Sequence, residues 1–180
     1  MTAEIGQFAL ILALMTAVYQ GVFPLLGAGR NDRALMAGGR LAAIAQLLFV
    51  LLAFGMLTVA HATDDFSVLN VFENSHSQKP FLYKLSGVWG NHEGSMLLWA
   101  LILAGYGGAL ALTAPVMTPL RARALAVQGL IATAFIAFIL FTSNPFTRIF
   151  PSPADGQDLN PLLQDPGLAL HPPFLYLGYV

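Results

Sequence analysis

The sequence contains no cysteine and few charged residues. Among its 180 residues, charged side chains make up 9% and hydrophobic side chains 57%. The lack of cysteine excludes disulfides, zinc–thiolate sites, iron–sulfur clusters and thiol catalysis. The shortage of charge excludes a secreted domain, a disordered tail and a basic nucleic-acid binder, because a soluble chain must cover its surface with polar groups. The composition therefore predicts a polytopic membrane protein, with the lipid bilayer and no nucleic acid as its partner.

Apolar runs of membrane length predict an all-α polytopic integral membrane protein. A hydrocarbon core of ~30 Å needs a helix of roughly 20 apolar residues. Four transmembrane helices are expected near residues 8–26, 41–60, 95–114 and 125–142. The start of a fifth span is expected at about residue 173. No ionisable residue falls in the middle of a span, so these helices show no proton or ion relay.

The basic residues predict the orientation of the chain in the membrane. Two short loops together hold five of the eight basic residues and one acid, Asp32. Cytoplasmic loops carry an excess of lysine and arginine. The N-terminus is therefore expected outside, together with two long outer loops at 61–94 and 143–173. Residues 1–180 are interpreted as a single membrane domain. The final apolar run, 172–180, predicts the N-terminal part of a longer protein.

The first outer loop contains the densest group of candidate binding residues. Residues 65–71 alternate loosely and favour a short extended strand. Asn91 or His92 is suited to cap the third long helix, and Glu93 suits the first turn of that helix. Trp89 fits an interfacial anchor. Each residue alone is explained by the start of a helix, but their clustering favours a ligand-facing site.

The second outer loop ends in a histidine followed by two prolines. Its apolar content favours an ordered loop rather than a disordered one. His171 precedes Pro172 and Pro173, which restrict the backbone at the predicted membrane surface. A histidine held among leucine, phenylalanine and tyrosine is suited to axial ligation of haem iron. The alternative is a boundary histidine whose ring bonds a carbonyl group.

Two long motifs give the chain a family resemblance. Residues 89–99 (WGNHEGSMLLW) and 160–180 (NPLLQDPGLALHPPFLYLGYV) resemble the N-terminal part of CcmF-type cytochrome c haem lyases. Shorter matches lie at 65–68 (DFSV) and 143–146 (SNPF). The resemblance covers the whole chain. It implies an inner-membrane protein of bacterial System I cytochrome c maturation, with functional loops that face the periplasm.

The resemblance also implies a cofactor, partners and a reaction. CcmF-type proteins receive haem from the haem chaperone CcmE and promote its thioether attachment to apocytochrome c, together with CcmH-type and CcmI-type subunits. The haem is b-type, as substrate or bound cofactor. His171 matches the first of two axial histidines of the family. The second histidine and a Trp-rich WWD segment would lie beyond residue 180. Trp89, Asn91, His92 and Glu93 are weaker candidates for contact with haem.

The sequence leaves other functions open. A non-catalytic membrane scaffold or a transporter subunit would dock partners through the same periplasmic loops. A haem exporter is less favoured because the spans offer no polar path. The sequence does not separate a general lyase from a relative that serves nitrite reductase maturation.

Overall fold

Four long antiparallel helices form a bundle that confirms the predicted spans. The computed structural model describes residues 1–113, 116–161 and 164–180. The long helices are α1 (Thr2–Arg30), α2 (Arg33–Ala62), α5 (His92–Thr113) and α6 (Pro119–Thr142). All four are long and apolar enough to cross a membrane. Each predicted span lies inside one of them, apart from residue 114, which falls outside the described residues.

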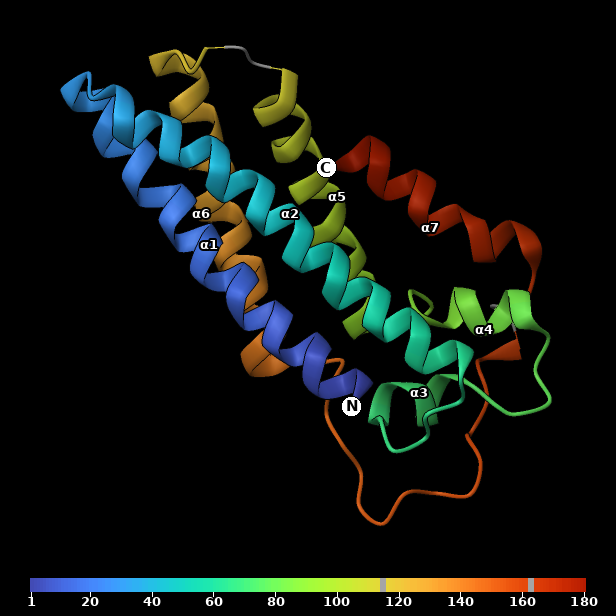
Figure 1. Ribbon diagram of the computed structural model, residues 1–180. Coiled ribbons are helices and arrows are strands. Elements are labelled where there is room, and N and C mark those ends of the chain that lie inside the picture. The colour runs from blue at the N-terminus through green and yellow to red at the C-terminus, as the bar shows by residue number, and fades with distance from the viewer. Residues whose placement is uncertain (114–115, 162–163) are drawn as a thin grey trace.

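Short capped connections make the bundle antiparallel. Asn31 ends α1 in the left-handed conformation (φ 53°), and the Asp32 carboxylate then accepts hydrogen bonds from the amides of Ala34 (2.9 Å) and Leu35 (3.2 Å). These bonds satisfy free N–H groups at the start of α2. We call this end of the bundle, which also carries the start of α6, the arginine end, and the opposite end the loop end (Figure 1).

Small residues and buried amides hold the bundle together. At Gly129 of α6, an added Cβ would lie 2.7 Å from the backbone nitrogen of Gly21, so α1 and α6 are in backbone contact. Gln20 donates to the carbonyl of Leu125 (2.9 Å). In the same way, Gln128 donates to the carbonyl of Leu103 (2.7 Å). Small residues and interhelical amide bonds are typical of helix packing inside membranes.

Two short helices, α3 (Leu69–Asn74) and α4 (Phe81–Gly87), lie at the loop end (Figure 1). The extended strand expected at 65–71 is therefore wrong. Val68 makes only an isolated bridge with Arg148, and the chain then turns into α3. The apolar side chains at 68, 71 and 72 have helical spacing, and this places Val68 and Val71 in the core.

The last helix, α7 (Pro166–Tyr179), begins earlier than the fifth span expected at about residue 173. The Asp165 carboxylate caps it by accepting from the amides of Gly167 (2.8 Å) and Leu168 (3.1 Å). Pro166 takes the first helical position, where its missing N–H costs nothing. Pro172 and Pro173 lie within the helix, so the second loop ends at residue 165 instead of 173. Helix α7 lies beside the bundle, on the side of α5 and α4 (Figure 1).

Candidate functional site at the loop end

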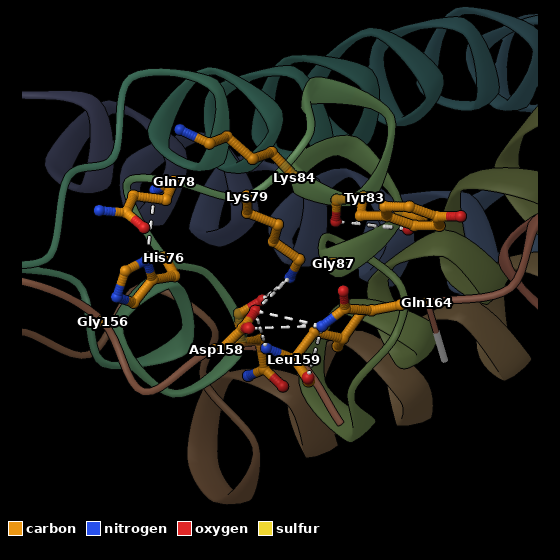
Figure 2. Close-up of polar contacts among 12 residues, drawn as sticks. His76, Gln78, Lys79, Tyr83, Lys84, Gly87, Gly156, Asp158, Leu159 and Gln164 are labelled. Carbon is orange, nitrogen blue, oxygen red and sulfur yellow. Dashed lines mark hydrogen bonds and ion pairs between the residues drawn. The ribbon is translucent and has the colours of Figure 1, made fainter. Parts of the chain in front are cut away.

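A buried lysine, Lys79, connects segments of the loop end. The Lys79 side chain is 1% exposed, lies 3.6 Å from Asp158 Oδ1 and donates to the carbonyl of Asn74 at 2.8 Å. Burial lowers the pKa of Lys79, and the Asp158 carboxylate opposes this shift. Figure 2 shows Lys79 reaching Asp158 of the second loop, which Gln164 also contacts. Lys79 therefore connects the two loops.

A second contact joins the same loops at the surface. Asp155 accepts hydrogen bonds from the Ser77 amide (3.0 Å) and the Ser77 hydroxyl (2.7 Å), and lies 3.4 Å from His76 Nε2. These Ser77 bonds lower the pKa of Asp155 to about 2. His76 also accepts from the amide of Gln78 at 3.2 Å (Figure 2). Both nitrogens of this ring are thus engaged inside the protein.

Arg148 connects the second loop to the start of α1. Its guanidinium bonds the Glu4 carboxylate at 2.6 and 2.8 Å and reaches Asp65 at 3.4 Å. Burial alone would raise the pKa of Asp65, but bonds from Ser67 and Thr2, together with Arg148, lower it. The loop end is therefore an ordered surface assembled from α1, the first loop and the second loop.

Trp89 connects the two sequence motifs that carry the family resemblance. Its indole N–H donates to the carbonyl of Ala169 in α7 at 2.8 Å. In an α-helix that carbonyl would accept from the amide four residues later, which here is Pro173 and has no N–H. Trp89 therefore fills a vacancy that the proline creates, and it sets the position of the helix that carries His171.

Asn91 and Glu93 turn into a buried polar network instead of toward α7. Asn91, one of the two caps that the sequence predicted, caps α5 by accepting from the amide of Gly94 (2.8 Å). Asn70 donates to Asn91 Oδ1 (2.8 Å) and lies 3.4 Å from Glu93 Oε2. Asn70 Oδ1 contacts Nε2 of the fully buried His61 at 3.0 Å. Sequence reasoning missed this network, although a histidine at the end of an apolar helix was a signal for it.

His92 points away from the other candidates. Its Nε2 lies 3.1 Å from the Ser143 hydroxyl, and its ring meets Phe138 of α6 edge-on at 6.3 Å. The cluster Trp89–Glu93 is thus continuous in sequence but divided in space, with side chains directed at α7, at Asn70 and at α6. Of these side chains, Trp89 is the one that hydrogen-bonds the helix that carries His171 in the described part of the chain.

His171 is the imidazole that the described residues leave without a partner. It is exposed on α7, and across 1–113, 116–161 and 164–180 neither ring nitrogen makes a hydrogen bond or ion pair. The carbonyl-bonded alternative is therefore absent from these ranges. The exposed neighbours on the helix are apolar: Leu168, Leu170, Phe174 and Leu175. His61, His76 and His92 each contact another polar group of the chain.

The donor chemistry at this end suits a prosthetic group better than a bare metal ion. Within the part of the chain that the structure describes, no three His, Asp or Glu side chains come together as a metal site. A metal at His171 would need most of its ligands from the bound group itself, as a porphyrin supplies them to iron. An exposed imidazole on an apolar helix fits that requirement.

Comparisons with known proteins agree with this architecture. Cytochrome c-type biogenesis protein CycK of Bradyrhizobium diazoefficiens is 59% identical over 181 residues, covering 100% of this chain and 27% of the relative. CcmF of Pseudomonas aeruginosa is 53% identical over 182 residues, covering 100% of this chain and 28% of its own length. The chain therefore spans little more than a quarter of these relatives.

A solved structure and a family model complete the comparison. The structure of Cytochrome c Heme Lyase CcmF superimposes with a TM-score of 0.84 over 99% of this chain and 28% of that chain. At 24% identity, this match shows a shared fold. The model of the family described as Cytochrome C assembly protein matches residues 89–180, which include both motifs joined by the Trp89–Ala169 bond. By this match over half of its length, the chain belongs to the cytochrome c assembly protein family.

Proposed function

We propose that this chain is the part of a membrane haem lyase that holds haem through His171 during thioether attachment to apocytochrome c. The observation that carries the proposal is the free imidazole of His171 on an exposed apolar helix, positioned by Trp89. Haem is the substrate of this reaction rather than a resident cofactor. A neutral imidazole on the iron would fix the height and tilt of the porphyrin, and orientation supplies much of the rate in such reactions.

The reaction itself needs positioning more than acid–base groups. Each thioether forms when a cysteine S–H adds across a vinyl group of haem, so that sulfur bonds one carbon and hydrogen the other. Holding the ring at one angle brings both vinyl groups into register with their thiols. His171 would act as a ligand and Trp89 as a positioning residue, whereas His61, Asn70 and Asn91 would stabilise the surface beneath them.

The proposal extends to location and partners. The loop end would face the periplasm of a bacterial inner membrane, since the arginine end carries the excess of basic residues. There it would receive haem from the chaperone CcmE and act with CcmH-type and CcmI-type subunits. The ordered loop end, with its two loops joined by Lys79 and Asp155, offers a rigid surface for such contacts.

The test is the visible spectrum of the detergent-purified full-length gene product after co-expression with the haem chaperone. We expect His171→Ala to lose the haem signal at this site, while His171→Cys and His171→Met keep part of it. His92→Ala is the matched control, because His92 bonds Ser143 and should affect stability rather than haem content. Unchanged spectra in His171→Ala would overturn the proposal and favour a scaffold or transporter subunit.

A second variant separates ligation from positioning. Trp89→Phe keeps an aromatic ring but removes the N–H that bonds Ala169. We expect it to bind haem with a shifted or broadened spectrum, because the ligand remains while its helix is less well held. A spectrum identical to that of the wild type would remove Trp89 from the positioning role.

A further inference from the structure

A cavity of about 500 Å³ opens at the arginine end, between the α1–α2 turn and the start of α6. Arg33 and Thr118 supply polar groups to its lining, and Met36, Ala37 and Met117 supply apolar ones. It lies at the opposite end of the bundle from α3 and α4 (Figure 1). Because membrane-length helices end here, the cavity is at the level of the lipid headgroups.

Most arginines at this end of the bundle, including Arg33 of the cavity lining, lack partners. Within the described ranges, four of them make no ion pair or side-chain hydrogen bond: Arg30, Arg33, Arg40 and Arg123. Arg121 donates to the carbonyl of Val116 at 3.1 Å, on the cavity wall. The acid at this end, Asp32, is engaged by two backbone amides. The positive charge at the cavity is therefore not compensated by the described residues.

We propose that this cavity binds the phosphate headgroup of an anionic phospholipid. Arg33 would bond the phosphate oxygens, since guanidinium groups match phosphate in geometry and charge. Buried Met36 and half-buried Met117 would contact the first carbons of the acyl chains. Basic pockets between transmembrane helices recognise anionic headgroups in this manner. The apolar wall at membrane depth favours a lipid over a soluble phosphate, which shares the headgroup chemistry but has no chain to bury.

The experiment is native mass spectrometry of the full-length gene product released from nanodiscs that contain equal amounts of phosphatidylcholine and phosphatidylglycerol. We expect the wild type to retain phosphatidylglycerol preferentially. Arg33→Gln should lower that preference about fivefold, the effect of one arginine near an anionic surface. Arg123→Gln is the matched control, because it removes the same charge from a residue that does not line the cavity.

A second variant tests the cavity independently of charge. Ala37→Trp fills the space and leaves every arginine in place, so it should also lower phosphatidylglycerol retention. Equal retention of both lipids, or equal losses in Arg33→Gln and Arg123→Gln, would overturn the proposal. Displacement of the lipid by excess inorganic phosphate would assign the cavity to a soluble anion and overturn it as well. Retention in excess phosphate supports the lipid.

Discussion

The two ends of the bundle use positive charge in different ways. At the loop end, Lys79, Lys84 and Arg148 each have a carboxylate partner. At the arginine end, none of the five guanidinium groups has a carboxylate partner among the described residues, and only Arg121 makes a side-chain hydrogen bond there, to a backbone carbonyl. The first pattern is structural, because the cations hold separate segments together. The second leaves charge available to the membrane surface. The number of basic residues alone does not distinguish these uses, and their partners do.

The largest effect is expected where a cation of the loop end loses its partner. Lys84 bonds Asp64 and donates to the carbonyl of Ser77 at 3.0 Å, with 11% of its side chain exposed. Lys84→Met should destabilise the protein by about 3 kcal/mol, because it leaves a carboxylate that is largely removed from water. Thermal unfolding in detergent measures this. The double variant Lys84→Met, Asp64→Leu should recover part of the loss; no recovery would refute pairing as the cause.

A somewhat smaller effect is expected in the polar network around Asn70, beneath the loops. Asn70→Ala removes the partner of His61 and one partner of Asn91. The cost should be about 2 kcal/mol, the usual penalty for leaving buried polar groups unsatisfied. Gln157→Ala, at an exposed amide of the second loop, is the control and should stay near the wild type. Equal melting temperatures for the two variants would contradict the importance of the network.

Acid should loosen the loop end locally. The pKa of Asp155 is lowered to about 2 in the folded protein, whereas an unfolded aspartate has a pKa of about 4. Asp155 therefore stabilises the loop contact fully above the unfolded pKa. That contribution is lost as the pH falls from about 4 toward 2. Hydrogen exchange at the Ser77 amide should therefore lose protection in this window, beyond the intrinsic pH dependence of exchange. Asp155→Asn should remove this response, and a response that persists in the variant would exclude Asp155 as its source.

The smallest effect is expected at the arginine end. Arg30→Gln removes a charge that has no partner in the described ranges. The free energy of unfolding in detergent should therefore change by less than about 0.5 kcal/mol. The contrast with Lys84→Met sharpens the comparison between the ends. A loss as large as that of Lys84→Met would show that the arginine end also depends on charge for its stability.

The bundle could be predicted from the sequence, and the loop end only in part. Charge-poor runs of membrane length predict the positions of the four long helices, because a helix that crosses the bilayer needs about 20 apolar residues. The start of α5 was predictable from local pattern as a cap at Asn91 or His92, and the structure assigns it to Asn91. Contacts such as Lys79–Asp158 and Trp89–Ala169 join residues about 80 positions apart, and local patterns carry no information on such pairs.

Helix α7 shows how a local rule can mislead. The two prolines argued for a helix that starts after them, yet Asp165 and Pro166 form a start signal further upstream. The helix tolerates Pro172 and Pro173 because an outside donor, Trp89, satisfies one of the carbonyls that they leave free. The cluster at 89–93 misled because its closeness in sequence suggested one shared site. Successive side chains on a turn and a helix point in different directions, so these residues are divided in space.

The Ala169 carbonyl of α7 can accept either from the amide of residue 173 or from the Trp89 indole. The regularity of the helix and its contact with Trp89 therefore depend on the same acceptor. Replacing Pro173 with alanine would restore an N–H and let the helix bond the Ala169 carbonyl itself. The same change would deprive the Trp89 indole of its acceptor and remove this tie to the helix. A more regular helix would thus be a less well-placed one. The carbonyl that Pro173 leaves free is what allows Trp89 to hold α7, and with it His171, in a defined position.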